Sequence, residues 1–198
     1  MNTPAHLIIA TAIFAKPSNL KVTWAAIIGG LLPDLSLYTL AAWSTLVQGN
    51  SAQHVFDNQY FSAGWQQFFA VDNSFFVWAL IIATGVFFRK HWLWVFGGAG
   101  FLHVCFDFLL HHDDARQHFW PFTDWVFNSP ISYWDHNYYG QIISVMEVGL
   151  CAVSLVLLWR RFTSKVAQLL IVGIATMELL PSIMFFVMQL KQPNIVAL

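Results

Sequence analysis

The sequence predicts an all-α membrane protein: a single domain over residues 1–198, built as a polytopic helix bundle of about six transmembrane helices with interfacial segments. Three observations predict this class. Hydrophobic residues make up 58% of the chain and charged residues only 10%, whereas soluble domains average about 45–50% and about 25%. The apolar residues form runs close to the ~20 residues that a membrane helix needs. The 10 tryptophans and 19 phenylalanines are typical of proteins that are anchored at membrane interfaces.

The first predicted helix, residues 3–16, is short. Thr3 and Pro4 are typical of a helix start, and Pro17 ends the helix. A helix of this length spans about 21 Å, whereas the hydrocarbon core is about 30 Å thick. We therefore expect its amino end, with His6, to lie below the membrane surface among other protein groups.

Five further apolar helices and two long connections follow. Residues 22–48 form the second helix, in which Pro33 predicts a kink directly before Asp34. The first long connection, 49–70, predicts a loop with an interfacial turn or helix. The second, 111–139, is rich in Trp and Tyr, which predicts an excursion held on the membrane surface or a lid over an amphipathic substrate. The remaining helices are predicted at 75–88, 91–110, 141–159 and 166–189.

The basic residues predict the orientation. Seven of the nine lie in the three connections that a six-helix chain places on one side: Lys16, Lys21, Arg89, Lys90, Arg160, Arg161 and Lys165. Only Arg116 and Lys191 fall on the other side. Because cytoplasmic loops carry the excess of Lys and Arg, we expect both termini and the connections 49–71 and 111–139 to face outside.

Acidic and histidine residues occur at one depth in every predicted helix. Counted from the basic end of each helix, they fall roughly 15–25 Å above the inner boundary, and they are His6, Asp34, Asp72, His103, Asp107, Glu147 and Glu178. Such groups are costly when they are buried without a partner. Because the chain has only 10 acidic residues, this coincidence predicts that they share a site, and a metal ion would offset the cost of burying them.

His103 and Asp107 are the centre of this prediction. They lie four residues apart on one helix face and can share one ion, although a His–Asp hydrogen bond without metal would also satisfy them. Asp72 has an alternative role as a helix N-cap, and Glu178 as a partner of a neighbouring helix. The next metal-competent residues can extend the site or form a solvated loop: His111, His112, Asp113, Asp114 and His118.

A family resemblance supports the metal prediction. His6, the Leu-Leu-Pro-Asp run ending at Asp34, and the His-x-x-x-Asp pair of His103 and Asp107 cover most of the first ~120 residues. In these motifs the chain resembles the membrane-bound, metal-dependent hydrolases, the group that includes LexA-regulated inner-membrane proteins. The resemblance implies a bacterial inner-membrane protein with a divalent metal ion on these four residues.

The chain departs from the family in one place. Where the family carries a His-Arg-Gly-x-Thr-His-Ser block, residues 71–78 are VDNSFFVW and contain no His and no Arg. Two ligand candidates and a cationic group are therefore missing. Either the hydrolytic site has been lost, or other residues replace them, the candidates being Asp72, His111, His112 and Asp113.

The first function that these observations predict is a metal-dependent hydrolase. It would act at the outer face on an ester or phosphoester of a lipid-like substrate drawn from the membrane lipid. The ion would be Zn²⁺, with Mn²⁺ or Fe²⁺ as alternatives. Glu147 or Asp72 would accept the proton of the attacking water. The ligands would come from His6, Asp34, His103, Asp107, His111, His112 and Asp113.

The second predicted function is a non-catalytic membrane protein: an accessory subunit or assembly factor with a structural metal or a His–Asp network, and with a membrane protein as its partner. The missing block and the aromatic surface favour it. A third is an ion transporter, against which the lack of an internal repeat counts. With a net charge of −1 and no basic run, the sequence indicates no nucleic acid partner.

Overall fold

All secondary structure in the described part of the chain is helical in this computed structural model, which describes the backbone of residues 1–191 and the side chains of residues 1–180. The prediction of an all-α fold is confirmed. The helices are α1 Thr3–Phe14, α2 Leu20–Ala42, α3 Ala52–His54, α4 Ala63–Asp72, α5 Phe75–Phe87, α6 His91–Leu110, α7 Gly140–Arg161 and α8 Lys165–Lys191. Shorter helical turns are η1 Trp43–Val47, η2 Val55–Gln59 and η3 His136–Tyr138.

Four stretches are long and apolar enough to cross a membrane, which is compatible with a multi-pass membrane protein: Leu20–Val47, Ala63–Phe87, His91–Leu110 and Gly140–Arg161. Helix α1 has 12 residues and is about 18 Å long, too short to span, as its sequence predicts. The predicted sixth span, 166–189, falls within α8, but its last side chains lie outside the described residues. The count of six spans therefore stays a prediction.

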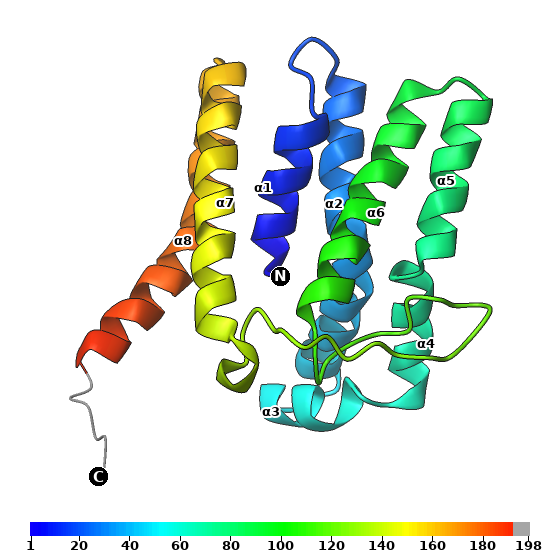
Figure 1. Cartoon of the computed structure of the whole chain (residues 1–198), viewed down its shortest axis with the longest axis vertical. Coiled ribbons are helices and arrows are strands. Elements are labelled where there is room, and N and C mark those ends of the chain that lie inside the picture. The colour runs from blue at the N-terminus through cyan, green and yellow to red at the C-terminus, as the bar shows by residue number, and fades with distance from the viewer. Residues whose placement is uncertain (192–198) are drawn as a thin grey trace.

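Helix α1 lies inside the bundle, with α7 and α8 on one side and α2 and α6 on the other (Figure 1). Its amino end lies at mid-height of the bundle, as expected from its length. Small and aliphatic side chains on α1, including Ala5 and Ile9, pack in one apolar cluster with Cys151 and Leu155 of α7. The three short connections with basic residues, α1–α2, α5–α6 and α7–α8, all lie at one end of the bundle (Figure 1).

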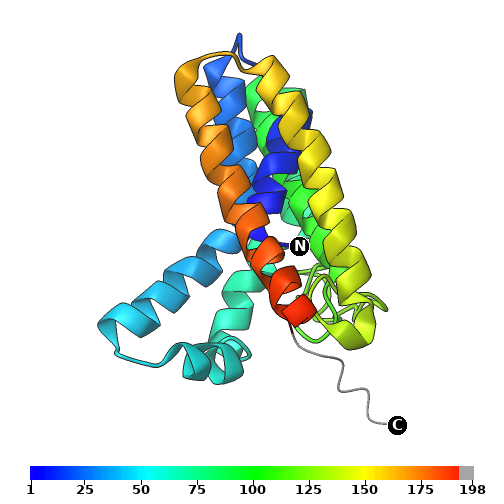
Figure 2. The same ribbon diagram turned by 90° about the vertical axis from the view of Figure 1, so that its left-hand side faces the viewer.

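Helix α2 changes direction near Pro33. Figure 2 shows its second half turned away from the bundle, with α3, η2 and α4 leading back to it. Pro33 lies within the helix, where proline removes a backbone hydrogen bond and bends the axis. The region 49–70 is more helical than the sequence predicts, because α4 begins at Ala63 and is continuous with α5 as one apolar stretch, Ala63–Phe87.

Two glycines set the spacing around α6. A Cβ on Gly29 of α2 would lie 2.3 Å from the carbonyl oxygen of Phe96, and one on Gly100 of α6 would lie 2.2 Å from the Trp78 ring. Small residues allow such close approach between membrane helices. Helix α6, which carries His103, is thereby held directly against α2 on one side and α5 on the other.

The connection 111–139 is partly folded into the protein rather than lying wholly on its surface. Arg116, His118, Ser129 and Ser132 are buried. The backbone N–H of Ser129 donates to the carbonyl of His111 at 3.0 Å, which ties this connection to the end of α6. Several of its aromatic side chains remain exposed, as predicted for an interfacial belt: Phe122, Trp125 and Trp134.

Candidate metal centre

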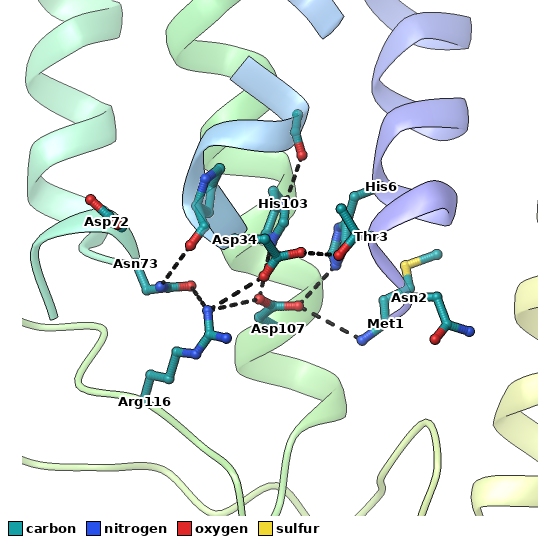
Figure 3. A network of polar contacts seen from close by, with 12 residues as sticks. Met1, Asn2, Thr3, His6, Asp34, Asp72, Asn73, His103, Asp107 and Arg116 are labelled. Carbon is teal, nitrogen blue, oxygen red and sulfur yellow. Dashed lines mark hydrogen bonds and ion pairs between the residues drawn. The ribbon is translucent and has the colours of Figure 1, made fainter. Parts of the chain in front are cut away.

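Three side chains from α1 and α6 converge at the centre of the bundle. Nε2 of His6 lies 2.9 Å from Oδ1 of Asp107, and Nε2 of His103 lies 3.1 Å from Oδ2 of the same carboxylate (Figure 3). The two imidazole rings stack in parallel, with centroids 3.5 Å apart and 8° between their planes. All three side chains are 1–2% exposed, and one ligand atom from each lies within 4.8 Å of the others. The predicted pairing of His6, His103 and Asp107 is present.

Nε2 of His103 faces negative charge. Nδ1 of His103 lies 2.7 Å from the carbonyl oxygen of Gly30, which can only accept, so Nδ1 carries a proton. In a neutral ring, Nε2 would then present its lone pair to Asp107 at 3.1 Å and to Oδ1 of Asp34 at 3.6 Å. A cation between these groups, either a proton or a metal ion, removes the conflict. An imidazole fixed by a second-shell carbonyl is the usual arrangement of a metal-bound histidine.

Asp34 is the fourth predicted ligand, and it lies beside this group. The kink at Pro33 directs it toward His103, and its other oxygen, Oδ2, accepts a hydrogen bond of 2.5 Å from the Thr3 hydroxyl (Figure 3). The same hydroxyl lies 2.7 Å from the Tyr38 hydroxyl, whose side chain is half exposed. Thr3 and Tyr38 therefore separate the buried carboxylate from the outside of the bundle.

Arg116 brings a buried positive charge to the same place. Its Nη1 lies 3.6 Å from Oδ1 of Asp34 and 4.0 Å from Oδ2 of Asp107 (Figure 3). Burial disfavours its charged form, but Tyr60 and these two carboxylates outweigh burial and hold the pKa of Arg116 above its ordinary value. No sequence pattern places this residue here, because it follows a run of polar residues in a connection that predicts a surface excursion.

His111 also reaches the group formed by His6, His103 and Asp107, whereas His112 and Asp113 do not. Helix α6 ends at Leu110 and His111 has extended backbone, so successive side chains beyond the helix point in different directions. Nε2 of His111 lies 3.2 Å from Oδ1 of Asp107, and its Nδ1 lies 2.9 Å from Oδ2 of Asp114. The His111 imidazole thereby holds the pKa of Asp114 below its usual range, although burial acts against this.

His112 and Asp113 were predicted as ligands but lie outside the group. Nδ1 of His112 donates to the Ser129 carbonyl at 2.6 Å, and its ring stacks on Tyr138. The Asp113 side chain is 65% exposed, and its nearest ionic partner is His112 at 3.4 Å. These contacts hold both side chains away from Asp107.

Asp72 and Glu147, the predicted proton acceptors, do not touch the His/Asp group. Asp72 ends α4 and lies beyond Asn73 (Figure 3), and Ser74 caps α5 in place of Asp72. Glu147 of α7 accepts a hydrogen bond of 3.0 Å from the backbone N–H of Asn2 and is paired with Glu178 of α8. The acidic and histidine residues that were predicted at one depth thus form two groups: the His/Asp group around Asp107, and a separate pair of Glu147 and Glu178.

The donor set fits a divalent ion. Two imidazoles and one or two carboxylates suit Zn²⁺, Mn²⁺ and Fe²⁺ alike, so these residues do not select among the three. His103 has the second-shell carbonyl that such a ligand needs, whereas Nδ1 of His6 has no hydrogen-bond partner among the described residues. His6, His103 and Asp107, with Asp34 beside them, are therefore the candidate ligands.

No known protein family, curated protein or solved structure matches this chain.

Proposed function

We propose that this chain is a membrane-bound, metal-dependent hydrolase of an ester or phosphoester, of the class that its sequence motifs resemble. The observation that carries the proposal is the convergence of His6, His103 and Asp107, with Nε2 of His103 directed at two carboxylates. A buried group of this kind needs a cation, and its residue types are those that bind catalytic zinc.

When bound, a divalent ion supplies Lewis-acid activation of water and of the substrate oxygen. The chain's residues would hold the ion and move the proton. His6, His103 and Asp107 would be the ligands. His111 is the best placed proton acceptor, because Asp114 lies 2.9 Å from its Nδ1 and its Nε2 faces Asp107. A base that is oriented by a carboxylate is a recurring catalytic arrangement.

A lipid-like substrate follows from the surroundings of α1. An apolar groove of about 280 Å³ runs along this helix from Leu7 and is lined by α2, α7 and α8. Leu7 directly follows His6 on α1, so the groove and the candidate ligand share this helix. The groove's lining is almost entirely aliphatic and aromatic, which suits an acyl chain of a membrane lipid.

The proposed location is a bacterial inner membrane with the centre toward the outer face. The three basic connections lie together at one end of the bundle (Figure 1). If that end faces the cytoplasm, as the excess of Lys and Arg predicts, then 111–139 with its His and Asp residues faces outside.

Turnover of a substrate panel by the purified protein tests the proposal. The zinc-loaded protein in maltoside detergent would be assayed with carboxylic and phosphate esters of short and long acyl alcohols. We expect turnover in the wild type and in His112→Ala, whose side chain lies outside the centre, and a loss of more than about 100-fold in His6→Ala. Equal turnover in His6→Ala, or none in the metal-loaded wild type, would refute the proposal.

The burial of the centre favours a second candidate, a non-catalytic subunit or assembly factor with a structural metal. His6, Asp34, His103 and Asp107 are only 1–7% exposed. A structural site would be closed in this way. Metal removal would then lower the melting temperature, no ester of the panel would be hydrolysed, and gentle detergent extraction would recover a stoichiometric membrane protein partner.

A further inference from the structure

Arg116 is buried beside the candidate ligands but is held in place by uncharged groups. Its Nη1 donates to Oδ1 of Asn73 at 3.0 Å, and its Nε donates to the Tyr60 hydroxyl at 3.4 Å. Its guanidinium carbon lies 5.1 Å from the centre of the Phe69 ring, a cation–π distance. Tyr60 directly follows η2, Phe69 lies in α4 and Asn73 directly follows α4, so one side of the bundle fixes the position of the cation.

The carboxylates nearest to Arg116 do not form a close ion pair with it. The distances of 3.6 Å to Asp34 and 4.0 Å to Asp107 exceed a charge-assisted hydrogen bond, which is about 2.7–2.9 Å. Arginine–carboxylate pairs are frequently short, two-pronged contacts. The fork of Arg116 is thus not taken up by either carboxylate.

A bound divalent ion would make the net charge at this place positive. With the histidines as neutral ligands, Asp34 and Asp107 supply two negative charges, whereas the ion and Arg116 together supply three positive charges. The side chains and the ion then carry a net single positive charge. A buried positive site with an arginine fork is complementary to an anion.

We infer that this centre takes a phosphoryl group, and that Arg116 is the residue that selects it. The inference rests on the proposed function and narrows its substrate from esters in general to phosphoesters. A phosphoryl group carries several oxygens, so one can face His6, His103 and Asp107 while another accepts from the guanidinium. A neutral carboxylic ester has one carbonyl oxygen and no charge, so it offers the guanidinium no charge-assisted hydrogen bond.

Binding of inorganic phosphate to the zinc-loaded protein tests this inference without any assay of turnover. Isothermal titration in maltoside would compare the wild type with Arg116→Gln, and with Arg160→Gln as the matched control. Arg160 is exposed at the end of α7, among the basic connections. We expect phosphate to bind about 10- to 100-fold more weakly to Arg116→Gln, with unchanged zinc content, and equally to the wild type and Arg160→Gln.

A ligand pair keeps the test decisive if Arg116→Gln does not fold. Dioctanoyl phosphatidate and dioctanoylglycerol differ only in the phosphoryl group, and we expect the wild type to bind the first at least about 10-fold more tightly. Phosphatidate binding that is tighter than that of inorganic phosphate identifies a lipid as the source of the group. Equal affinities identify a water-soluble phosphate, and both results uphold the inference.

Three results would overturn it. Zinc-loaded protein that binds neither phosphate nor phosphatidate refutes the inference and leaves a hydrolase of neutral esters. Equal phosphate affinity in folded Arg116→Gln and the wild type shows that Arg116 does not select the group. A protein that retains no zinc refutes the proposed function and this inference together, and zinc analysis before each titration separates that case from the other two.

Discussion

Replacing Gly29 by alanine tests whether the centre depends on the close approach of α2 and α6. A Cβ at this position would lie 2.3 Å from the Phe96 carbonyl oxygen, whereas ordinary van der Waals contact begins at 3.4 Å. The obstacle is backbone, which cannot rotate away as a side chain can. The two helices must therefore separate by roughly 1 Å, and Asp34 of α2 moves away from His103 of α6.

The expected cost can be worked out from two opposing effects. Overpacking between helices costs typically about 1–3 kcal/mol, and a backbone clash belongs at the upper end. Alanine in place of glycine regains about 1 kcal/mol of helix propensity. The net loss of about 2 kcal/mol corresponds to a melting temperature lower by about 4–8 °C for a chain of this size. Because Asp34 is displaced, the affinity for zinc should also fall.

Thermal unfolding in detergent, followed by tryptophan fluorescence, measures this loss. Gly149→Ala is the matched control, since a Cβ on this exposed residue of α7 meets nothing within 4 Å. We expect the control to melt at or slightly above the wild-type temperature with the same zinc affinity. A Gly29→Ala protein that matches the control in both measurements would refute the packing argument.

Two further predictions concern acid stability and topology. His118 is buried with Nδ1 2.9 Å from the Asn73 carbonyl, and burial lowers its pKa to about 4, below its ordinary value of 6.5. Because the unfolded chain then binds more protons than the folded protein, the free energy of unfolding decreases as the pH falls from about 6.5 to about 4. We expect this decrease to be about 3 kcal/mol larger in the wild type than in His118→Phe. Identical pH profiles of the two melting temperatures would contradict this. For topology, a periplasmic reporter inserted at the exposed Phe122 should be active and one at Ser164 silent, and the reverse pattern would overturn the orientation.

Much of the centre could be predicted because depth in a membrane follows from counting residues along a helix. His6, Asp34, His103 and Asp107 lie on three different helices, yet each lies a similar number of residues from a basic end. The short α1 then brings His6 to mid-height in the bundle, as its length requires. The kink at Pro33 was equally visible, since proline removes a helical hydrogen bond wherever it occurs.

The rest depended on the direction of the chain after the helices end. His111 and His112 are neighbours, but one faces Asp107 and the other Ser129, because α6 stops at Leu110. No helical period extends into that connection, so the sequence could not separate a partner of the centre from a residue outside it. The division between the centre and the pair of Glu147 and Glu178 likewise depends on which helices pack against which.

Arg116 was missed because its burial depends on partners that are distant in the sequence. Tyr60, Phe69 and Asn73 hold it, and they belong to a region that predicts a loop and an interfacial turn. The one available signal was the position of Arg116 itself, an isolated basic residue on the side of the membrane that carries few. In a chain with only nine basic residues, such an exception deserved a structural explanation.

Elemental analysis of the purified protein tests the central claim most directly. The wild type and Asp107→Asn would be prepared in the same detergent without added chelator, and their transition metals counted by mass spectrometry. We expect about one divalent ion per chain in the wild type and a loss of most of it in Asp107→Asn, because both imidazoles face this carboxylate. A wild-type protein without bound transition metal, or equal metal content in the two proteins, would contradict the account.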